Sequence, residues 1–226
     1  MIVTKNFVFL HLHKSGGTFI NQALLNYFPD ALQIGYHLPV SELPECYSHL
    51  PLLGVVRNPW DYYVSWYSFQ LTLKQPTFVW RVFSEDGRLN FSQTVERMLV
   101  AGEDEVTLNR LRELAPETFL NRNVNLTKHC LPYLKGQSFG WYTFLFRRMY
   151  DDFPVHFLKI ENLRSEFYAF LRSKVEITPE LHSFIFESPK INATPHDDYR
   201  AYYSDRLARL LQEREAAIVE RFGYAF

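Results

Sequence analysis

The sequence from residue 7 to residue 20 reads Phe7-Val8-Phe9-Leu10-His11-Leu12-His13-Lys14-Ser15-Gly16-Gly17-Thr18-Phe19-Ile20. Its first half is apolar, aromatic and β-branched, which predicts a buried strand. The pattern breaks at residues 15–17, and apolar residues then recur at helical spacing, at Phe19, Ile20, Ala23, Leu24 and Tyr27. This strand, glycine turn and helix form the first of several units that predict an α/β fold.

The turn in this stretch has the chemistry of an anion-binding loop. Glycines let backbone N–H groups approach oxygen atoms closely, and a helix N-terminus presents unpaired N–H groups and a partial positive charge. Lys14 adds a full charge, and Ser15 and Thr18 add hydroxyl groups. The turn therefore predicts a phosphate cradle, and the alternative is an ordinary strand–helix turn with Thr18 as its cap.

The rest of the chain continues the alternation of strands and helices. Residues 52–57 form an apolar run typical of a parallel strand covered on both faces, and Asn58 with Pro59 predicts a capped helix start. An extended piece is expected at 32–37 and a further strand at 155–160, whereas 74–90 and 121–135 are expected to be irregular. The other expected helices are 92–100 with Ser92 as cap, 103–115, 141–150, 161–172, and 202–222 as one amphipathic helix ended by Gly223.

Two cations lie just beyond the carboxyl ends of predicted strands, namely Lys14 and Arg57. Ligands of parallel sheets bind beyond the carboxyl ends of the strands, so two cations at one edge indicate an anion site. The 226 residues are enough for one substantial core, and no repeat or linker interrupts them. We therefore expect a central parallel sheet flanked by helices, in a single domain that spans residues 1–226.

The composition disfavours several other classes of protein. A formal net charge of -1 argues against a broad nucleic-acid interface. Cys46 and Cys130 are too few for a disulfide scaffold, so we expect reduced thiols, with one disulfide as the alternative. No signal-peptide pattern or apolar run of roughly 18 residues is present, which predicts no transmembrane segment. We expect a cytoplasmic protein, or a luminal one if the sequence is a trimmed luminal domain.

The turn at residues 13–18 differs from a Walker A motif. In Walker A the lysine follows the glycines, whereas here Lys14 precedes them. The sequence also has no convincing strand that ends in Asp and would hold Mg²⁺. Both points disfavour an ATP-dependent kinase, and we expect no bound metal.

Taken together, residues 9–18 and 55–67 resemble the sulfotransferase superfamily that uses 3′-phosphoadenosine 5′-phosphosulfate (PAPS), in its carbohydrate-type or bacterial-type form. In that family a PKTGGT or PKSGGT loop binds the 5′-phosphosulfate, and an RxPxxRxxS motif binds the 3′-phosphate. The resemblance implies a P-loop-like, nucleotide-binding sulfotransferase fold. It assigns the donor to seven residues: Lys14, Ser15, Gly16, Gly17 and Thr18 at the 5′ end, and Arg57 and Ser65 at the 3′-phosphate.

Two residues depart from the family pattern. His13 replaces the usual Pro before the lysine, and Tyr62 replaces the usual second Arg of the 3′ motif. The phosphate contacts of that motif come from its first Arg and its Ser, so the assignment of Arg57 and Ser65 is retained. Taken alone, Ser65 would be a mid-helix serine bonded to a carbonyl, and Arg57 a strand-end charge or an ion-pair partner of Asp61.

The resemblance continues more weakly toward the end of the chain. Residues 157–163 are similar to the strand of the family that ends in a YEDL-type turn, and residues 222–226 are similar to its common FGY terminus. Residues 190–203 are similar to the segment that returns to cover the nucleotide. Residues 75–150 carry no signature, so we expect acceptor specificity to lie there. Three aromatic residues form either core or the lining of an acceptor cleft: Trp66 just before this range, and Trp141 and Tyr142 within it.

Sulfuryl transfer to a hydroxyl group requires a base, and His suits that role near neutral pH. Carbohydrate sulfotransferases have a catalytic His in a similar context before the 3′ motif, so the resemblance implies that His37 is the base. His13 and then Glu42 are rivals, and His11 is expected to order the loop. The alternative for His37 is a bond within the turn before Pro39. Lys14 would stabilise charge on the leaving bridge oxygen.

We therefore expect an enzyme that transfers a sulfuryl group from PAPS to a hydroxyl of a carbohydrate or small-molecule acceptor by in-line displacement. The product of the donor would be 3′-phosphoadenosine 5′-phosphate (PAP). Two alternatives are a P-loop kinase-like phosphotransferase and a nucleotide-binding module without catalysis.

Overall fold

The computed structural model of the chain describes residues 1–119, 126–150, 153–191 and 194–226. Its described residues divide into two compact units, and each unit is treated by itself below. The first unit contains residues 1–57, 149–150 and 153–191, and the second contains residues 58–119, 126–148 and 194–226. That residues 1–226 form a single domain stays a prediction.

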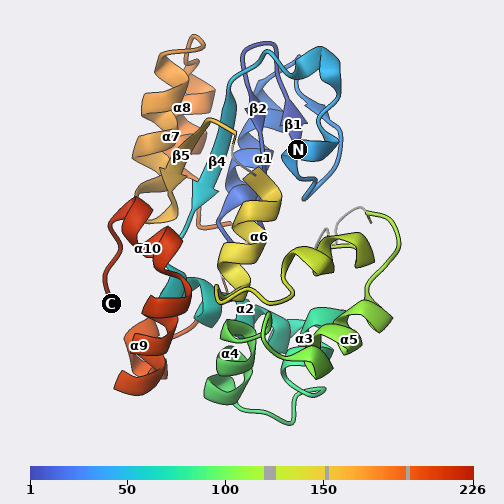
Figure 1. The fold of residues 1–226 in the computed structure, drawn as a ribbon. Helices are drawn as coiled ribbons and strands as arrows, with labels where there is room; N and C mark the ends of the chain where they lie inside the picture. The colour runs from blue at the N-terminus through green and yellow to red at the C-terminus, as the bar shows by residue number, and fades with distance from the viewer. Residues whose placement is uncertain (120–125, 151–152, 192–193) are drawn as a thin grey trace. The chain divides into compact units, whose positions relative to one another are not determined.

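The first unit is built on a five-stranded sheet with the strand order β3-β1-β2-β4-β5 (Figure 1). Its centre is parallel, as predicted: β2 (Val8–Phe9) pairs with β4 (Leu52–Val56), which pairs with β5 (Val155–Lys159). Strand β1 (Ile2–Val3) runs antiparallel to β2 and to β3 (Leu32–Gln33). The α/β class is confirmed, and the β1–β3 edge makes the whole sheet mixed.

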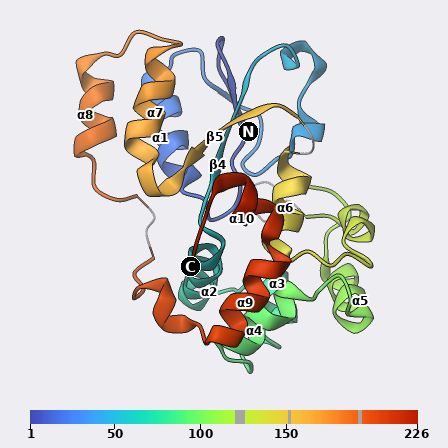
Figure 2. The same ribbon diagram turned by 60° about the vertical axis from the view of Figure 1, so that its left-hand side comes forward.

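Three helices of the first unit pack with this sheet: α1 (Gly17–Tyr27), α7 (Leu163–Arg172) and α8 (Pro179–Glu187). Figure 2 shows them grouped beside the strands. Their apolar faces share one core with the strands, in which Phe7 meets Phe170 edge-on with ring centroids 5.1 Å apart. The continuous apolar pattern of β4 is explained by burial of all its residues.

The second unit is helical and holds most of the large aromatic side chains. Its helices are α2 (Pro59–Thr72), α3 (Phe78–Phe83), α4 (Phe91–Leu99), α5 (Glu105–Leu114), α6 (Trp141–Tyr150, whose last two residues belong to the first unit), α9 (Asp205–Arg214) and α10 (Ala216–Phe222). All four tryptophans of the chain are buried here: Trp60, Trp66, Trp80 and Trp141. The helix α3 lies within 74–90, where the sequence predicted irregular structure.

Side-chain caps fix where two of these helices begin. The start of α2 agrees with the prediction, because Asn58 Oδ1 accepts a hydrogen bond from the Trp60 N–H at 2.9 Å. The predicted cap Ser92 of α4 is wrong. Asn90 is the cap, and it exchanges hydrogen bonds with Gln93 in a capping box, so the helix begins one residue before Ser92.

The prediction of one long helix over 202–222 is also wrong, because the helix is interrupted at Glu215, between α9 and α10. The Arg214 carbonyl accepts a hydrogen bond from the Gly140 N–H at 2.8 Å, and Glu215 turns its side chain into the core. The stop at Gly223 is confirmed, since this residue ends α10 with φ of 64°.

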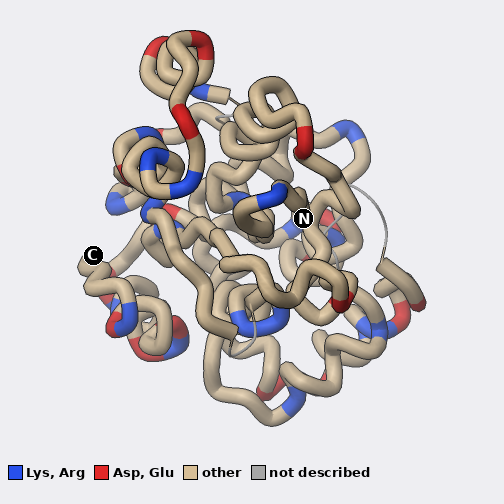
Figure 3. The backbone as a smooth tube through the Cα atoms, turned by 90° about the horizontal axis from the view of Figure 1, so that it is seen from above, with Lys and Arg blue, Asp and Glu red and all other residues tan. Residues whose placement is uncertain are grey.

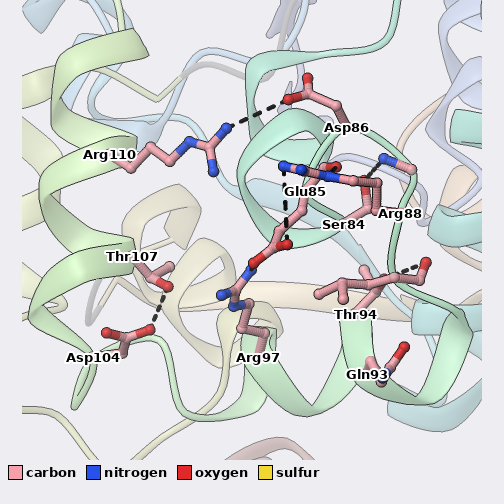
Figure 4. Close-up of polar contacts among 12 residues, drawn as sticks. Ser84, Glu85, Asp86, Arg88, Gln93, Thr94, Arg97, Asp104, Thr107 and Arg110 are labelled. Atoms are coloured by element: carbon pink, nitrogen blue, oxygen red, sulfur yellow. Dashed lines mark hydrogen bonds and ion pairs between the residues drawn. The ribbon is translucent and has the colours of Figure 1, made fainter.

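Charged residues of both signs are interspersed along the backbone (Figure 3). Figure 4 shows one such group in the second unit, around the turn that follows α3. Asp86 accepts from Arg81 at 3.0 Å and from Arg110 at 3.4 Å, while Glu85 pairs with Arg97 at 2.8 Å. These partly exposed pairs link the turn to α4 and α5, and each contributes little stability on its own.

Candidate functional site

The turn between β2 and α1 has an unusual backbone. Lys14 and Gly16 both have left-handed conformations, with φ of 59° and 82°. The conformation of Lys14 costs on the order of 1–3 kcal/mol, and such strain is concentrated at functional sites. Between them, the buried Ser15 donates its hydroxyl proton to the Leu12 carbonyl at 2.6 Å. A Cβ atom on Gly16 would lie 2.7 Å from Ile160 Cδ1, so the turn requires glycine at this position.

The first turn of α1 contains no negatively charged side chain that would offset the partial positive charge of the helix N-terminus. Gly16 is the N-cap and forms no side-chain cap hydrogen bond, and the first turn of α1 contains no acidic residue. Thr18 is half-buried there, with its hydroxyl 3.5 Å from the Tyr36 hydroxyl. The predicted phosphate loop therefore has the backbone form that favours an anion.

Lys14 and Arg57 come together at the carboxyl edge of β2 and β4, as predicted. Arg57 directly follows β4, and its Nη1 atom donates to the Lys14 carbonyl at 3.1 Å. Burial, together with the nearby Arg57 guanidinium, lowers the pKa of Lys14 to about 8. Two neighbouring cations repel each other unless an anion lies between them or beside them, so this edge is suited to a negatively charged ligand.

The structure brings His37 next to this loop. Its Nδ1 atom donates to the His11 carbonyl at 2.8 Å, so the neutral ring carries its proton on Nδ1 and a lone pair on Nε2. The ring centroid of His37 lies 4.5 Å from that of His11 and 5.3 Å from that of His13. Burial lowers the pKa of His37 to about 4, so the ring is neutral at pH 7.

His11 connects His37 to the phosphate loop. Its ring is buried, and Asn21 on α1 donates from Nδ2 to its Nδ1 atom at 3.1 Å. A Cβ atom on Gly17 would lie 2.2 Å from His11 Cδ2, so the first turn of α1 packs directly on the imidazole. Burial, and next the His37 ring, hold the pKa of His11 well below its usual range. These contacts join the His11 ring to α1 and to His37, and its expected role in ordering the loop stays a prediction.

The other predicted site residues lie as follows. His13 is half-buried beside His37, and burial holds its pKa well below the usual range. The third candidate base, Glu42, is exposed in a 3-10 turn at Val40–Glu42. In the second unit, Ser65 is buried on α2. Tyr62, in place of the usual second Arg, stacks on Tyr142 with ring centroids 3.9 Å apart.

The aromatic residues considered for an acceptor cleft are core residues of the second unit. Trp66 is 1% exposed, and Trp141 and Tyr142 are fully buried. The sequence left two interpretations open for these residues, core packing or an acceptor cleft, and the structure supports core packing.

Glu215 has a buried environment that the sequence did not indicate. One carboxylate oxygen, Oε1, accepts from the Tyr63 hydroxyl and from the Tyr142 N–H at 3.1 Å. The other, Oε2, accepts from the Thr143 N–H at 2.8 Å and from the Thr143 hydroxyl at 2.5 Å. Burial raises the pKa of Glu215 to about 7, against the effect of these hydrogen bonds. Helix α6 is therefore capped from a distant part of the chain.

Three further findings concern the cysteines, metal ligands and helix lengths of the described residues. Cys46 is exposed, Cys130 is buried, and neither forms a disulfide, which agrees with the expected free thiols. In the described part of the chain, no group of three or more His, Cys, Asp or Glu side chains is arranged to hold a metal ion. None of the helices within residues 1–119, 126–150, 153–191 and 194–226 is both long enough and apolar enough to cross a membrane.

Comparisons with known proteins found similar chains among the solved structures. No family model matches the chain, and no curated protein matches it. The structure is similar to the crystal structure of mouse sulfotransferase SULT7A1 complexed with PAP, with 14% sequence identity over 97% of this chain and 89% of that chain, and a TM-score of 0.45. A likeness this distant carries no argument by itself, so the description of the fold rests on the sheet topology.

Proposed function

We propose that this chain is a sulfotransferase that moves the sulfuryl group of PAPS to a hydroxyl group on a carbohydrate or small-molecule acceptor. The observation that carries the proposal is the pairing of Lys14 and Arg57 at one edge of the parallel strands, where Arg57 bonds the Lys14 carbonyl at 3.1 Å. The motif around both residues resembles the donor-binding motifs of that superfamily.

The donor is assigned to two sets of residues. Lys14, Gly16, Gly17 and Thr18 bind the 5′-phosphosulfate, and Ser15 contributes its backbone N–H, because its hydroxyl is bonded to the Leu12 carbonyl. Arg57 and Ser65 bind the 3′-phosphate, an assignment that rests on the motif alone. A guanidinium can bind phosphate through two parallel hydrogen bonds, which makes Arg57 the strongest single contributor.

In the proposed reaction His37 acts as the base. The acceptor oxygen attacks sulfur in line with the bridge oxygen, and the S–O bridge bond breaks with its electron pair going to PAP. His37 Nε2 accepts the proton of the acceptor hydroxyl, since Nδ1 is already protonated. A pKa of about 4 is low for this task, but a bound anionic donor raises the pKa of a neighbouring imidazole. Lys14 stabilises the charge on the bridge oxygen.

Calorimetry tests the proposal most directly. PAP should bind in the presence of EDTA, and Arg57→Ala should abolish that binding. The matched control is Arg81→Ala, which removes an exposed arginine that pairs with Asp86 in the second unit and should leave binding unchanged.

Two outcomes would overturn the proposal. Tight binding of ATP with Mg²⁺, without preference for a 3′-phosphate, would favour a kinase-like phosphotransferase. Binding of PAP without sulfation of any member of a broad panel of hydroxyl compounds would favour a nucleotide-binding module without catalysis.

A further inference from the structure

We propose that Asn21 is a positioning residue for His37, acting through His11. In this proposal Asn21 keeps the His11 ring neutral and protonated on Nε2, and His11 then orients His37. The inference rests on the proposed function of His37 as the base, and it concerns a residue outside the donor motifs.

The first step is the hydrogen bond between Asn21 and His11. The amide Nδ2 atom is a donor, so the His11 Nδ1 atom 3.1 Å away must offer a lone pair. The ring proton of neutral His11 is then on Nε2. An imidazolium would place a second N–H group against the amide N–H, so this contact also disfavours the charged form of His11.

The second step is the energetic cost of Asn21 itself. Asn21 is 4% exposed on the inner face of α1, between apolar neighbours, and its Oδ1 atom has no hydrogen-bond partner in the described part of the chain. A buried polar atom left without a partner destabilises the folded state, because it has lost its hydrogen bonds to water. An apolar residue would pack this position without that cost, so the amide is explained by what its donor does to His11.

The third step links His11 to His37. The His11 carbonyl accepts the Nδ1 proton of His37 at 2.8 Å, and the two ring centroids are 4.5 Å apart. The His11 ring cannot move toward α1, because Gly17 leaves no space there. A positive charge on His11 at this distance would make His37 a weaker proton acceptor. Asn21 thus protects both the orientation and the basicity of His37.

Nitrogen-15 NMR of the histidine rings tests the arrangement without donor, acceptor or turnover. At pH 7, His11 should be protonated on Nε2 and His37 on Nδ1. Asn21→Asp replaces the donor by an acceptor, so His11 should gain a proton on Nδ1. The control Asn26→Asp changes an exposed asparagine on the same helix and should leave both rings unchanged. An Nδ1 proton on His11 in the unaltered protein would overturn the proposal.

Kinetics test the positioning role once sulfuryl transfer is measurable. Asn21→Asp and Asn21→Leu should lower kcat by about ten- to a hundredfold, with the Kd for PAP unchanged. Equal losses of kcat and PAP affinity, or a normal kcat despite an altered His11 ring, would overturn the proposal. Circular dichroism melts identify a variant that fails to fold, and the NMR result in the unaltered protein then decides. If no transfer is found while both predicted ring protons are present, the proposed function fails and the ring arrangement stands.

Discussion

The two units each bury one cluster of titratable groups, and the clusters differ in how completely they are hydrogen-bonded. In the second unit, each carboxylate oxygen of Glu215 accepts two hydrogen bonds. In the first unit, His37 donates from Nδ1 to the His11 carbonyl, so its neutral ring keeps a lone pair on Nε2. A saturated group holds structure together, whereas a buried group with a free lone pair can still take a proton. Burial alone does not separate these two roles, but the hydrogen-bond inventory does.

The largest effect on turnover should come from removing His37. We expect His37→Ala to lower kcat by about 10²- to 10⁴-fold, because a base contributes that much, while the Kd for PAP stays the same. Steady-state kinetics and calorimetry on one preparation check both quantities. Retained turnover in this variant would contradict the assignment and move the role of base to His13.

Removing Glu215, whose carboxylate oxygens each accept two hydrogen bonds, should lower stability instead of turnover. Glu215→Ala leaves the N–H groups of Tyr142 and Thr143 buried without an acceptor, so the free energy of unfolding should fall by about 3 kcal/mol. Urea denaturation measures this loss. Glu220→Ala, on the exposed face of α10, is the control and should change stability by less than about 0.5 kcal/mol. A loss of kcat in the folded Glu215→Ala protein would contradict the contrast between the clusters.

The features that could be predicted from the sequence are those determined by local pattern or by chain topology. The start of α2 follows from the Asn58 cap, and the meeting of Lys14 with Arg57 follows from two parallel strands ending at one edge. The turn at residues 13–18 is also a local feature, because its glycines and its lysine are adjacent in the chain.

The break at Glu215 and the role of Asn21 were not predictable in this way. The apolar residues Leu211 and Ile218 on either side of Glu215 keep helical spacing, so the pattern shows no break. The break depends on Gly140, which lies far away in sequence and bonds the Arg214 carbonyl. Asn21 likewise resembles any polar residue on a helix until the His11 ring is seen beside it. Strand β1 has only two residues, too few to show a period.

A smaller effect is expected from the charge on Lys14. Its pKa of about 8 means that the ammonium group loses its proton above pH 8, so the affinity for PAP should fall by up to about tenfold per pH unit beyond that point. Lys14→Arg keeps a positive charge at all accessible pH values and should remove this decline. Calorimetry from pH 7 to pH 10 measures it. A decline of equal size in the Lys14→Arg protein would assign the titration to another group.

The sharpest test of the contrast concerns how stability depends on pH. Burial lowers the pKa of His37 from 6.5 to about 4 and raises the pKa of Glu215 from 4.5 to about 7. Between pH 4 and 6.5 the unfolded chain binds more protons at His37 than the folded chain, so this residue makes stability rise with pH. Between pH 4.5 and 7 the folded chain binds more protons at Glu215, so that residue makes stability fall with pH.

Each shift corresponds to a change on the order of 3 kcal/mol, with opposite signs for the two residues, and the lowered pKa values of His11 and His13 add to the contribution of His37. Single substitutions should separate the contributions of His37 and Glu215 to the pH dependence of stability. Relative to the unaltered protein, Glu215→Gln should make the free energy of unfolding rise more steeply from pH 4.5 to pH 7, because glutamine does not titrate. His37→Asn should make it rise less steeply over pH 4–6.5 than in the unaltered protein, because asparagine does not titrate either while His11 and His13 still do. Denaturation curves at half-unit pH intervals measure both slopes, and changes in slope of the same sign in the two variants, relative to the unaltered protein, would show that the clusters do not differ as described.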